Sequence, residues 1–204
     1  MKPSRIEQGK IIVAEPFLHD PYFKRAVVLF VEHSKQGTMG FVINAPSNIK
    51  VCDAIQDFPK VDLPVFVGGP VDSDIIFYVH NLEKQIPNST KIRSGIFWGG
   101  DFAAVQQLAR ENKLNNDNIR FYMGYAGWGP AQIRDEMKKQ SWFCYSCKKD
   151  YVFHKAPRRL WGQILKDNNS PFSVLSNFSD TPSLNWSIHK STRKQSFPMV
   201  FVQQ

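Results

Sequence analysis

A continuous apolar run at residues 26–31, Ala-Val-Val-Leu-Phe-Val, constrains the fold more than any other feature of the chain. A strand with one solvated face alternates apolar and polar residues, whereas this run does not alternate and is rich in β-branched side chains. It therefore predicts a strand covered on both faces, at the centre of a sheet. The turn residues 37–40, Gly-Thr-Met-Gly, lead into a second apolar segment at residues 41–44, which predicts a hairpin.

The remaining elements are predicted from periodicity, turn residues and caps. Asp101 is the expected N-cap of a helix, and Gly68-Gly69-Pro70 predicts a turn between two strands that form a second hairpin-like unit. Strands predominate early and helices late, without sustained βαβ alternation, which predicts an α+β fold with a mixed sheet. Strands are expected at residues 9–16, 65–67, 75–79 and 119–122, and helices at residues 102–112, 130–140 and 158–166.

The chain is long enough for one domain, since its 204 residues with 42% hydrophobic content can enclose one substantial core. We expect this domain at residues 1–182 and a basic tail at residues 183–204. The longest apolar run is far shorter than the roughly 20 residues of a membrane helix, and the N-terminus lacks a signal-peptide pattern. Three cysteines cannot form the paired framework of a secreted scaffold. A cytoplasmic protein without a membrane association is therefore predicted.

The excess of positive charge, +8 at pH 7, raises nucleic acid as a partner. Lys190, Arg193 and Lys194 lie in the acid-free tail, and a group of lysines brackets the aromatic segment at residues 142–145. Basic residues between aromatics would bind a single strand through stacking and charge neutralisation. The same pattern is more often the solvated rim of a strand. Non-specific nucleic-acid binding is therefore a secondary alternative.

Four segments of the chain share their order and spacing with one known family. They are residues 9–16 with Asp20, Phe23 and Arg25; Glu32-His33 through residues 40–44; Gly68-Gly69-Pro70-Val71; and Gly124-Tyr125-Ala126-Gly127-Trp128, followed by Gln132 and Glu136. Each motif alone is weak, but together, over residues 7–166, they resemble the AlgH/YqgE family. The resemblance implies a single α+β domain of strongly coiled, branching β-sheets with flanking helices.

The resemblance implies little about chemistry. The family's biochemical function is mostly unassigned, its name derives from a proposed transcriptional regulator, and it offers no catalytic residue, cofactor or DNA contact to transfer. Cys144-x-x-Cys147 is not a motif of the family, and residues 186–204 lie outside the resemblance. The roles of these segments depend on their own residues.

The glycine-rich passage at residues 121–130 is the most suggestive candidate site. Its glycines follow an expected strand and precede an expected helix, whose first unpaired N–H groups and positive dipole end would favour an anion. A small anionic metabolite or nucleotide would then bind at the loop of residues 124–129. The spacing of dinucleotide and P-loop fingerprints is absent, and Pro130 removes one donor. The alternative is a tight packing turn closed over Trp128.

A second candidate cluster consists of polar residues around the expected hairpin. His33 follows the central strand and Asn44 ends its partner, so both would converge with Arg25 at one end of the sheet. In the structural alternative, Asn44 bonds the loop ending in Pro46, His33 satisfies backbone groups and Arg25 pairs with a carboxylate. No serine elbow or triad spacing accompanies His33. The candidate ligand-binding residues of both clusters are Arg25, His33, Asn44, Gly124, Gly127, Trp128 and Gln132.

The pair Cys144-x-x-Cys147 would be half of a zinc site or a redox pair. A structural zinc ion needs four ligands, and only His154 and the remote Cys52 are available to complete the set. A thioredoxin-like pair has its first cysteine at a helix N-terminus, whereas residues 142–145 look extended. The sequence therefore predicts neither a metal nor a cofactor.

The function hypotheses follow from these patterns. Because no catalytic constellation emerges and the family is named after a regulator, the leading hypothesis is a non-enzymatic regulatory or interaction protein with an unknown protein partner. The alternative is an enzyme or sensor that binds a small anionic ligand between residues 124–129 and the end of the sheet with Arg25, His33 and Asn44. A concave pocket there would favour this alternative, and a flat apolar patch would favour a protein partner.

Overall fold

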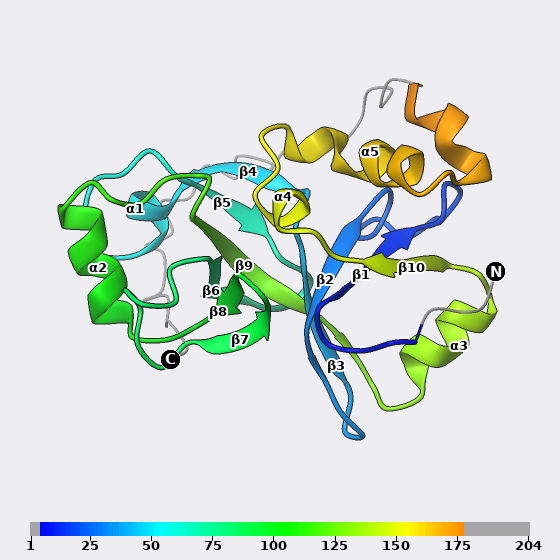
Figure 1. The fold of residues 1–204 in the computed structure, drawn as a ribbon, viewed down its shortest axis with the longest axis horizontal. Coiled ribbons are helices and arrows are strands. Elements are labelled where there is room, and N and C mark those ends of the chain that lie inside the picture. The colour runs from blue at the N-terminus through cyan, green and yellow to red at the C-terminus, as the bar shows by residue number, and fades with distance from the viewer. Residues whose placement is uncertain (1–4, 178–204) are drawn as a thin grey trace, which may run out of the picture.

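Ten strands of the computed structural model, which describes residues 5–177, form one curled and branched sheet with helices around it (Figure 1). The expected tail at residues 183–204 lies outside the described residues. The elements in chain order are β1 (Lys10–Ala14), β2 (Val27–His33), β3 (Thr38–Val42), β4 (Pro46–Lys50), α1 (Val51–Ala54), β5 (Pro64–Val67), β6 (Val71–His80), β7 (Thr90–Arg93), β8 (Ile96–Trp98), α2 (Phe102–Arg110), β9 (Ile119–Trp128), α3 (Gln132–Lys138), β10 (Trp142–Ser146), α4 (Lys149–Val152), η1 (Pro157–Arg159), α5 (Leu160–Asp167) and η2 (Pro171–Asn177).

The sheet follows the strand order β10-β1-β2-β3-β9-β6-β8-β7, and β4 and β5 branch from it at β9. Strand β9 is the branch point because it pairs antiparallel with β3 and β6 and parallel with β5. This long, mostly buried strand therefore joins the two parts of the sheet. The α+β class, the coiled and branching sheet and the flanking helices agree with the sequence-based expectation.

The central hairpin is formed as the apolar run predicts. Strands β2 and β3 pair antiparallel, with Leu29 opposite Phe41. Successive residues of β2 point to opposite faces: Val27, Leu29 and Val31 belong to one buried core, and Val28 and Phe30 belong to another. The absence of alternation in this run is thus explained by apolar packing on both faces.

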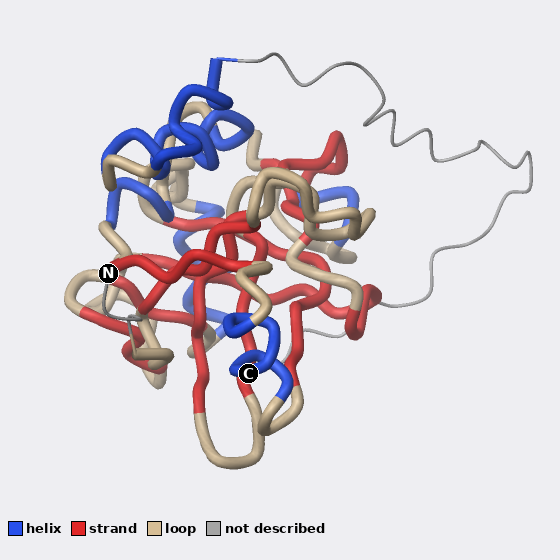
Figure 2. The backbone as a smooth tube through the Cα atoms, turned by 90° about the vertical axis from the view of Figure 1, so that its right-hand side faces the viewer, coloured by secondary structure: helices blue, strands red, loops and turns tan. Residues whose placement is uncertain are grey.

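Helices cover these cores on different sides of the sheet. Helices α4 and α5 cover the core that contains Leu29 and Phe41, while α3 packs on the core that contains Phe30 (Figures 1 and 2). Trp161 of α5 donates its indole N–H to the carbonyl of Ala14 at 2.8 Å, which fixes the helix to β1. Within residues 5–177 no helix has the length and apolarity that a membrane crossing requires.

A third core lies under α2 and α1. The carboxylate of Asp101 accepts from the N–H of Ala103 at 2.8 Å, so the expected N-cap is confirmed. Val105, Leu108 and Ala109 of the helix are buried, in agreement with the 3.6-residue periodicity. This helix packs on the face of β6 and β9 opposite to α4, since Tyr78 and Phe121 contribute to its core.

The expected second hairpin-like unit is wrong. Strands β5 and β6 do not pair with each other; both flank β9, where Tyr122 has Phe66 on one side and Phe77 on the other. The glycines after β5 serve a chain crossing instead of a hairpin turn. A Cβ atom on Gly68 would lie 2.2 Å from the carbonyl oxygen of Gly124, so the two backbones can only approach this closely without a side chain.

Candidate functional site

The polar residues of the hairpin do not converge. His33 lies at the turn end of β2, where its Nδ1 is 2.7 Å from the hydroxyl of Thr38. Asn44 lies at the opposite end: its Oδ1 accepts from the N–H of Val27 at 2.8 Å, and its Nδ2 donates to the carbonyl of Arg25 at 3.0 Å. In an antiparallel hairpin, the residue after the second strand returns to the start of the first. The expected cluster is therefore wrong for His33 and holds only for Arg25 and Asn44.

Arg25 and Asn44 serve the fold at this end of the sheet. Arg25 has a backbone φ of 52°, which is uncommon for residues other than glycine, asparagine and aspartate. Its guanidinium lies 5.0 Å from the ring centroid of Trp161, a cation–π contact. The amide of Asn44 bonds the carbonyl of Arg25 and the N–H of Val27, so it holds the backbone at the start of β2. This supports a structural role, but the partners differ from the expected ones: Asn44 does not bond the loop that ends in Pro46, and His33 bonds a side-chain hydroxyl and not a backbone group.

The expected loop at residues 124–129 is also wrong. Residues 124–128 continue β9, and Gly127 pairs with Met39 of β3. Gly124 has a φ of 68°, and a Cβ there would lie 2.7 Å from the carbonyl oxygens of Gly69 and Val71. The glycines therefore permit close backbone packing within a strand and do not form an anion-binding loop. The packing alternative agrees with this geometry.

Trp128 and Gln132 belong to a hydrogen-bonded network around Glu136. The indole N–H groups of Trp128 and Trp142 donate to Oε2 of Glu136 at 3.1 and 2.7 Å, and Nε2 of Gln132 donates to Oε1 at 2.9 Å. Oε1 of Gln132 in turn accepts from the N–H of Gly129 at 3.2 Å. These polar groups satisfy one another and hold α3 against the strands.

His33 instead contributes to a different cluster, at the tip of the β2–β3 hairpin. His33 and Lys35 meet Pro130 and Arg134 around a pocket of about 350 Å³, which also includes Ser34. These side chains are exposed. The pocket is cationic, but it contains neither Arg25 nor Asn44.

The two cysteines of the Cys144-x-x-Cys147 pair have protonated, buried thiols. Burial raises the pKa of Cys144 to about 11 and that of Cys147 to about 12. A thiol with such a pKa is a poor nucleophile at neutral pH, because the thiolate is the reactive form. Residues 5–177 contain no group of three or more His, Cys, Asp or Glu side chains with the geometry of a metal site.

The most unusual polar residue, Arg120, lies at the other end of β9 and was missed in the sequence. Its side chain is 3% exposed, its Nη2 donates to the carbonyl of His154 at 2.7 Å, and its Cζ lies 4.6 Å from the ring centroid of Phe66. Among the described residues, its Nε and Nη1 have no hydrogen-bond partner. A buried guanidinium with this little compensation is costly, because both charge and donors have left water.

Two further polar atoms without partners accompany Arg120 on the same face of the sheet. The hydroxyl of Tyr122 and the indole Nε1 of Trp98 are buried and unpaired within residues 5–177. Arg120 and Tyr122 are two residues apart on β9, and Arg120 and Trp98 both pair with Val79 of β6, so the three share one face. Burial raises the pKa of Tyr122, so the phenol stays protonated at neutral pH. Burial lowers the pKa of Arg120, but an arginine guanidinium is not deprotonated in proteins.

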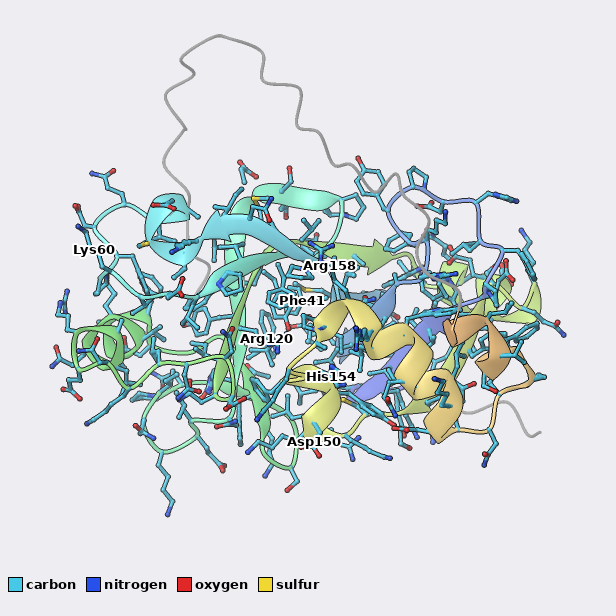
Figure 3. The ribbon with its side chains drawn as sticks, turned by 90° about the horizontal axis from the view of Figure 1, so that it is seen from above. Phe41, Lys60, Arg120, Asp150, His154 and Arg158 are labelled. Atoms are coloured by element: carbon cyan, nitrogen blue, oxygen red, sulfur yellow. The ribbon has the colours of Figure 1, made fainter. Side chains whose placement is uncertain are left out.

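An open pocket of about 490 Å³ lies between the chain just before β9 and the segment around α4. It is lined by Asp117, Lys149, Asp150, Phe153, His154 and Lys155. His154 connects the pocket to the guanidinium, since it lines the pocket and its carbonyl accepts from Arg120. Figure 3 views this region from the side of α4 and α5, with Arg120, Asp150 and His154 labelled. We call the pocket and the guanidinium together the Arg120 site.

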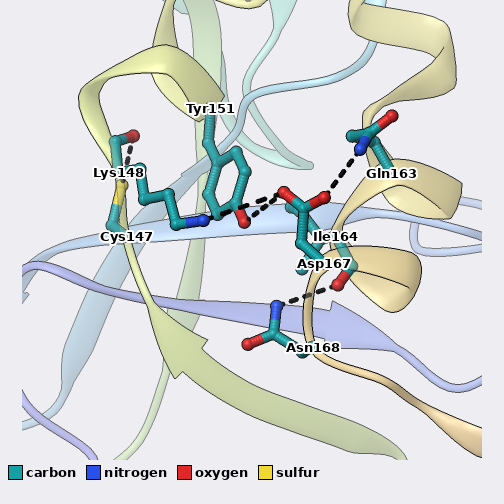
Figure 4. Close-up of polar contacts among 7 residues, drawn as sticks. All are labelled: Cys147, Lys148, Tyr151, Gln163, Ile164, Asp167 and Asn168. Atoms are coloured by element: carbon teal, nitrogen blue, oxygen red, sulfur yellow. Dashed lines mark hydrogen bonds and ion pairs between the residues drawn. The ribbon is translucent and has the colours of Figure 1, made fainter.

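The position of α4 over this site is held by one carboxylate. The hydroxyl of Tyr151 donates to Oδ2 of Asp167 at 2.7 Å, and Nε2 of Gln163 donates to Oδ1 at 2.7 Å (Figure 4). Lys148 adds an ion pair at 3.9 Å. The hydrogen bond from Tyr151 lowers the pKa of Asp167, so this carboxylate is charged at neutral pH. Helix α4 is thereby fastened to α5.

A signal for the Arg120 site is present in the sequence. The expected strand at residues 119–122 reads Ile-Arg-Phe-Tyr, so it places an arginine within a short apolar strand. Charged residues are rarely buried without a partner. The sequence could not predict that Arg120 lacks hydrogen-bond partners, because the groups around it come from β5, β8 and the segment around α4, which are distant in the sequence.

Comparison with known proteins places this chain in a family. A family model described as AlgH-like (DUF179) matches residues 11–173. A UPF0301 protein of Chlorobium limicola is 34% identical over 181 residues, which cover 89% of this chain and 97% of the relative. The UPF0301 protein BF2109 of Bacteroides fragilis is 36% identical over 184 residues, covering 90% and 92%.

Two solved structures share the fold. Protein DIP2367 from Corynebacterium diphtheriae has a TM-score of 0.73 at 21% identity and covers 87% of this chain and 95% of its own. The AlgH protein from Pseudomonas aeruginosa has a TM-score of 0.69 at 22% identity and covers 89% and 100%. The names of these relatives assign no biochemical activity. This chain belongs to the AlgH-like family, whose biochemical function is uncharacterised.

Proposed function

We propose that this protein is a non-enzymatic, regulatory binding protein whose ligand is a small anionic molecule held at the Arg120 site. The observation that carries the proposal is the guanidinium of Arg120, which is 3% exposed and has two nitrogen atoms without partners among the described residues. The sequence-based alternative of a small anionic ligand is thereby kept, while the site moves from residues 124–129 to the opposite end of the same strand.

An anion would complete the unsatisfied chemistry of Arg120. Isolated buried charges are strongly unfavourable, and a guanidinium is compensated best by an oxyanion that accepts its N–H groups. The single backbone carbonyl of His154 satisfies one nitrogen and carries no charge. A carboxylate or phosphate at the two unpaired nitrogens would neutralise the charge and accept more than one hydrogen bond.

Entry requires a shift of the segment that separates the pocket from the guanidinium. The unpaired nitrogens are sealed from solvent, and His154, whose carbonyl accepts from the third nitrogen, also lines the open pocket. Lys149 and Lys155 line the open pocket together with Asp117 and Asp150, so the attraction for an anion comes from the guanidinium and not from a net charge of the pocket. The proposed ligand therefore binds the unpaired Nε and Nη1, while Nη2 keeps its bond to the carbonyl of His154.

A thermal-shift screen tests this proposal. The panel is inorganic phosphate, sugar phosphates, nucleotides and carboxylates, applied to the wild-type protein and to two variants, Arg120→Met and Arg134→Met. Binding at 100 times Kd adds about 2.7 kcal/mol to the free energy of unfolding. We expect at least one anion to stabilise the wild type and Arg134→Met but not Arg120→Met.

The two variants separate the two cationic pockets. Loss of the shift in Arg134→Met and its retention in Arg120→Met would move the site to the pocket at the hairpin tip and contradict the proposal. Absence of any shift with the whole panel would contradict anion binding altogether.

A protein partner is the second candidate. Phe17 and Tyr22, in the segment between β1 and β2, are 65% and 51% exposed, and aromatic side chains are enriched in protein–protein interfaces. A Phe17→Ser variant that captured the same proteins as the wild type in an affinity experiment would remove this candidate. Nucleic-acid binding has less support, because Trp142 and Tyr145 are buried and do not offer open ring faces to bases.

We further propose that the protein works in the cytoplasm. The support is chemical: its three cysteines are free thiols, and Cys144 and Cys147 are buried in the core. Reduced thiols are typical of cytosolic proteins. Cell fractionation with an antibody to the protein tests this, and recovery in an extracellular or periplasmic fraction would contradict it.

A further inference from the structure

We infer that the ligand of the Arg120 site is a monocarboxylate, held between the guanidinium of Arg120 and the hydroxyl of Tyr122, and not a phosphate ester. This inference rests on the proposed function and adds the chemical class of the anion. It is carried by the second orphaned group, since Tyr122 also lacks a partner within the described residues.

The two groups lie on one face of β9 and share a wall. The guanidinium of Arg120 lies 4.6 Å from the ring centroid of Phe66, and the ring of Tyr122 lies 5.7 Å from the same centroid. Phe41 stacks on Tyr122 at 5.0 Å with an interplanar angle of 9°, which fixes the phenol ring. The polar ends thus project from an aromatic wall that holds both side chains in place.

The segment around α4 closes over both groups. Arg120 reaches the carbonyl of His154, just after α4. Cys147, just before α4, belongs to the same buried core as Tyr122. An acceptor group that enters beneath this segment would therefore meet the donors of Arg120 and Tyr122 on the face of β9.

The donors suit a carboxylate in number and charge. Tyr122 remains protonated because burial raises its pKa, so it offers one O–H donor, and Arg120 offers its Nε and Nη1 groups. A carboxylate presents two oxygen atoms and accepts from several donors. Its single negative charge balances the single positive charge of Arg120, so the ligand and the guanidinium together are neutral within the apolar site.

A phosphate ester would bring too much charge. Phosphate monoesters carry about −1.5 to −2 at pH 7, so part of that charge would stay uncompensated beside the aromatic wall. The pocket edge does not make up the difference, since Lys149 and Lys155 are matched by Asp117 and Asp150. The site therefore selects a monoanion over a dianion.

Titration calorimetry with defined probes tests the inference. The probes are acetate, pyruvate and benzoate as monocarboxylates, and inorganic phosphate and glycerol 3-phosphate as phosphates. The proteins are the wild type, Arg120→Met and Tyr122→Phe, a change that removes only the hydroxyl. We expect at least one monocarboxylate to bind at least tenfold more tightly than either phosphate, with affinity reduced about tenfold in Tyr122→Phe and lost in Arg120→Met. Circular dichroism melting of each variant verifies that it is folded.

The outcomes separate this inference from the proposed function. Phosphate binding that is tighter than carboxylate binding and lost in Arg120→Met would overturn the monocarboxylate inference and leave anion binding at Arg120 intact. Carboxylate binding unchanged in folded Tyr122→Phe would remove Tyr122 from the site. Equal affinity of folded Arg120→Met and wild type for every probe would overturn both.

Discussion

Strand β9 differs at its two ends, although it is one continuous strand. The end with Gly124 and Trp128 is rich in family motifs. Gly124 packs closely against the neighbouring backbone, and the indole N–H of Trp128 has an acceptor in Glu136. The end with Arg120 and Tyr122 carries no recognised motif, and it contains three of the four buried polar atoms without partners in the described part of the chain. The glycine-rich end builds the fold, whereas the apolar end with one arginine has the unsatisfied chemistry that a ligand would complete.

This difference shows why motif density and binding capacity need not coincide. A glycine motif reflects the need of two backbones to approach each other closely, which a side chain would prevent. A ligand site has buried donors or charges that lack partners in the protein, and these are found only when the partners of each buried polar atom are checked. The following predictions test each end, from the largest expected effect on stability to the smallest.

Replacement of Gly124 by alanine should have the largest effect. The residue has a φ of 68°, and a Cβ would lie 2.7 Å from two backbone oxygens. Left-handed strain costs about 1–2 kcal/mol and overpacking about 1–3 kcal/mol, so the free energy of unfolding should fall by about 3 kcal/mol or more. Urea unfolding measures the change.

Gly129→Ala is the matched control from the same sequence motif. A Cβ at Gly129 would meet nothing within 4 Å, so its unfolding midpoint should equal that of the wild type. Equal stability of both variants would show that the crossing of the chains at Gly124 is not tight, and would remove the contrast between the two ends.

His80 provides a buried titratable group beside the Arg120 end whose hydrogen bonds are complete. It pairs with Ile119, and its ring nitrogens bond the carbonyl of Gly99 and the N–H of Leu82, each at 3.1 Å. Burial lowers its pKa to about 4. Between this value and the ordinary pKa of 6.5, the unfolded chain binds a proton that the folded chain does not, so stability falls as the pH is lowered through this window.

Acidification from pH 7 to pH 5 should therefore remove about 2 kcal/mol of stability through His80, at about 1.4 kcal/mol per pKa unit. Urea unfolding at both pH values, on the wild type and on His80→Gln, isolates this part. An equal loss in both proteins would mean that His80 is not the responsible group.

Glu136→Ala should have an intermediate effect at the glycine-rich end. The change leaves the indole N–H groups of Trp128 and Trp142 without their acceptor. Unsatisfied buried donors cost about 1–3 kcal/mol, and we expect a loss of about 1.5 kcal/mol in urea unfolding. Glu136→Gln retains an acceptor oxygen and should lose less. An alanine variant as stable as the wild type would show that water serves both indoles equally well.

Sequence patterns predicted the local parts of this fold and failed where distant segments meet. The β2–β3 hairpin and α2 with its Asp101 cap follow from periodicity and short-range signals. The pairing of β5 and β6 was wrong because Gly68-Gly69-Pro70 resembles a hairpin turn, while the actual partner is β9, far along the chain. Local sequence cannot distinguish a glycine in a turn from a glycine at a chain crossing.

The candidate site was harder to predict for the same reason. Arg120 stands in a correctly expected strand, but its environment comes from Phe66 on β5 and from His154, 34 residues along the chain. The family motifs drew attention to Gly127 and Trp128 because they were recognisable. An arginine within an apolar strand is a weaker pattern, and its meaning depends on how many of its donors find acceptors.

Arg120→Met should have the smallest effect on stability and the opposite tendency. The variant loses one hydrogen bond to His154 and a cation–π contact with Phe66, but it also removes a buried charge without a counterion. Replacement of buried charged groups by apolar side chains of similar size is often neutral or stabilising. In the absence of ligand, the free energy of unfolding should thus equal that of the wild type or exceed it by about 1 kcal/mol. A loss of about 2 kcal/mol or more would mean that the guanidinium is well satisfied in the folded protein, and the distinction between the two ends of β9 would then disappear.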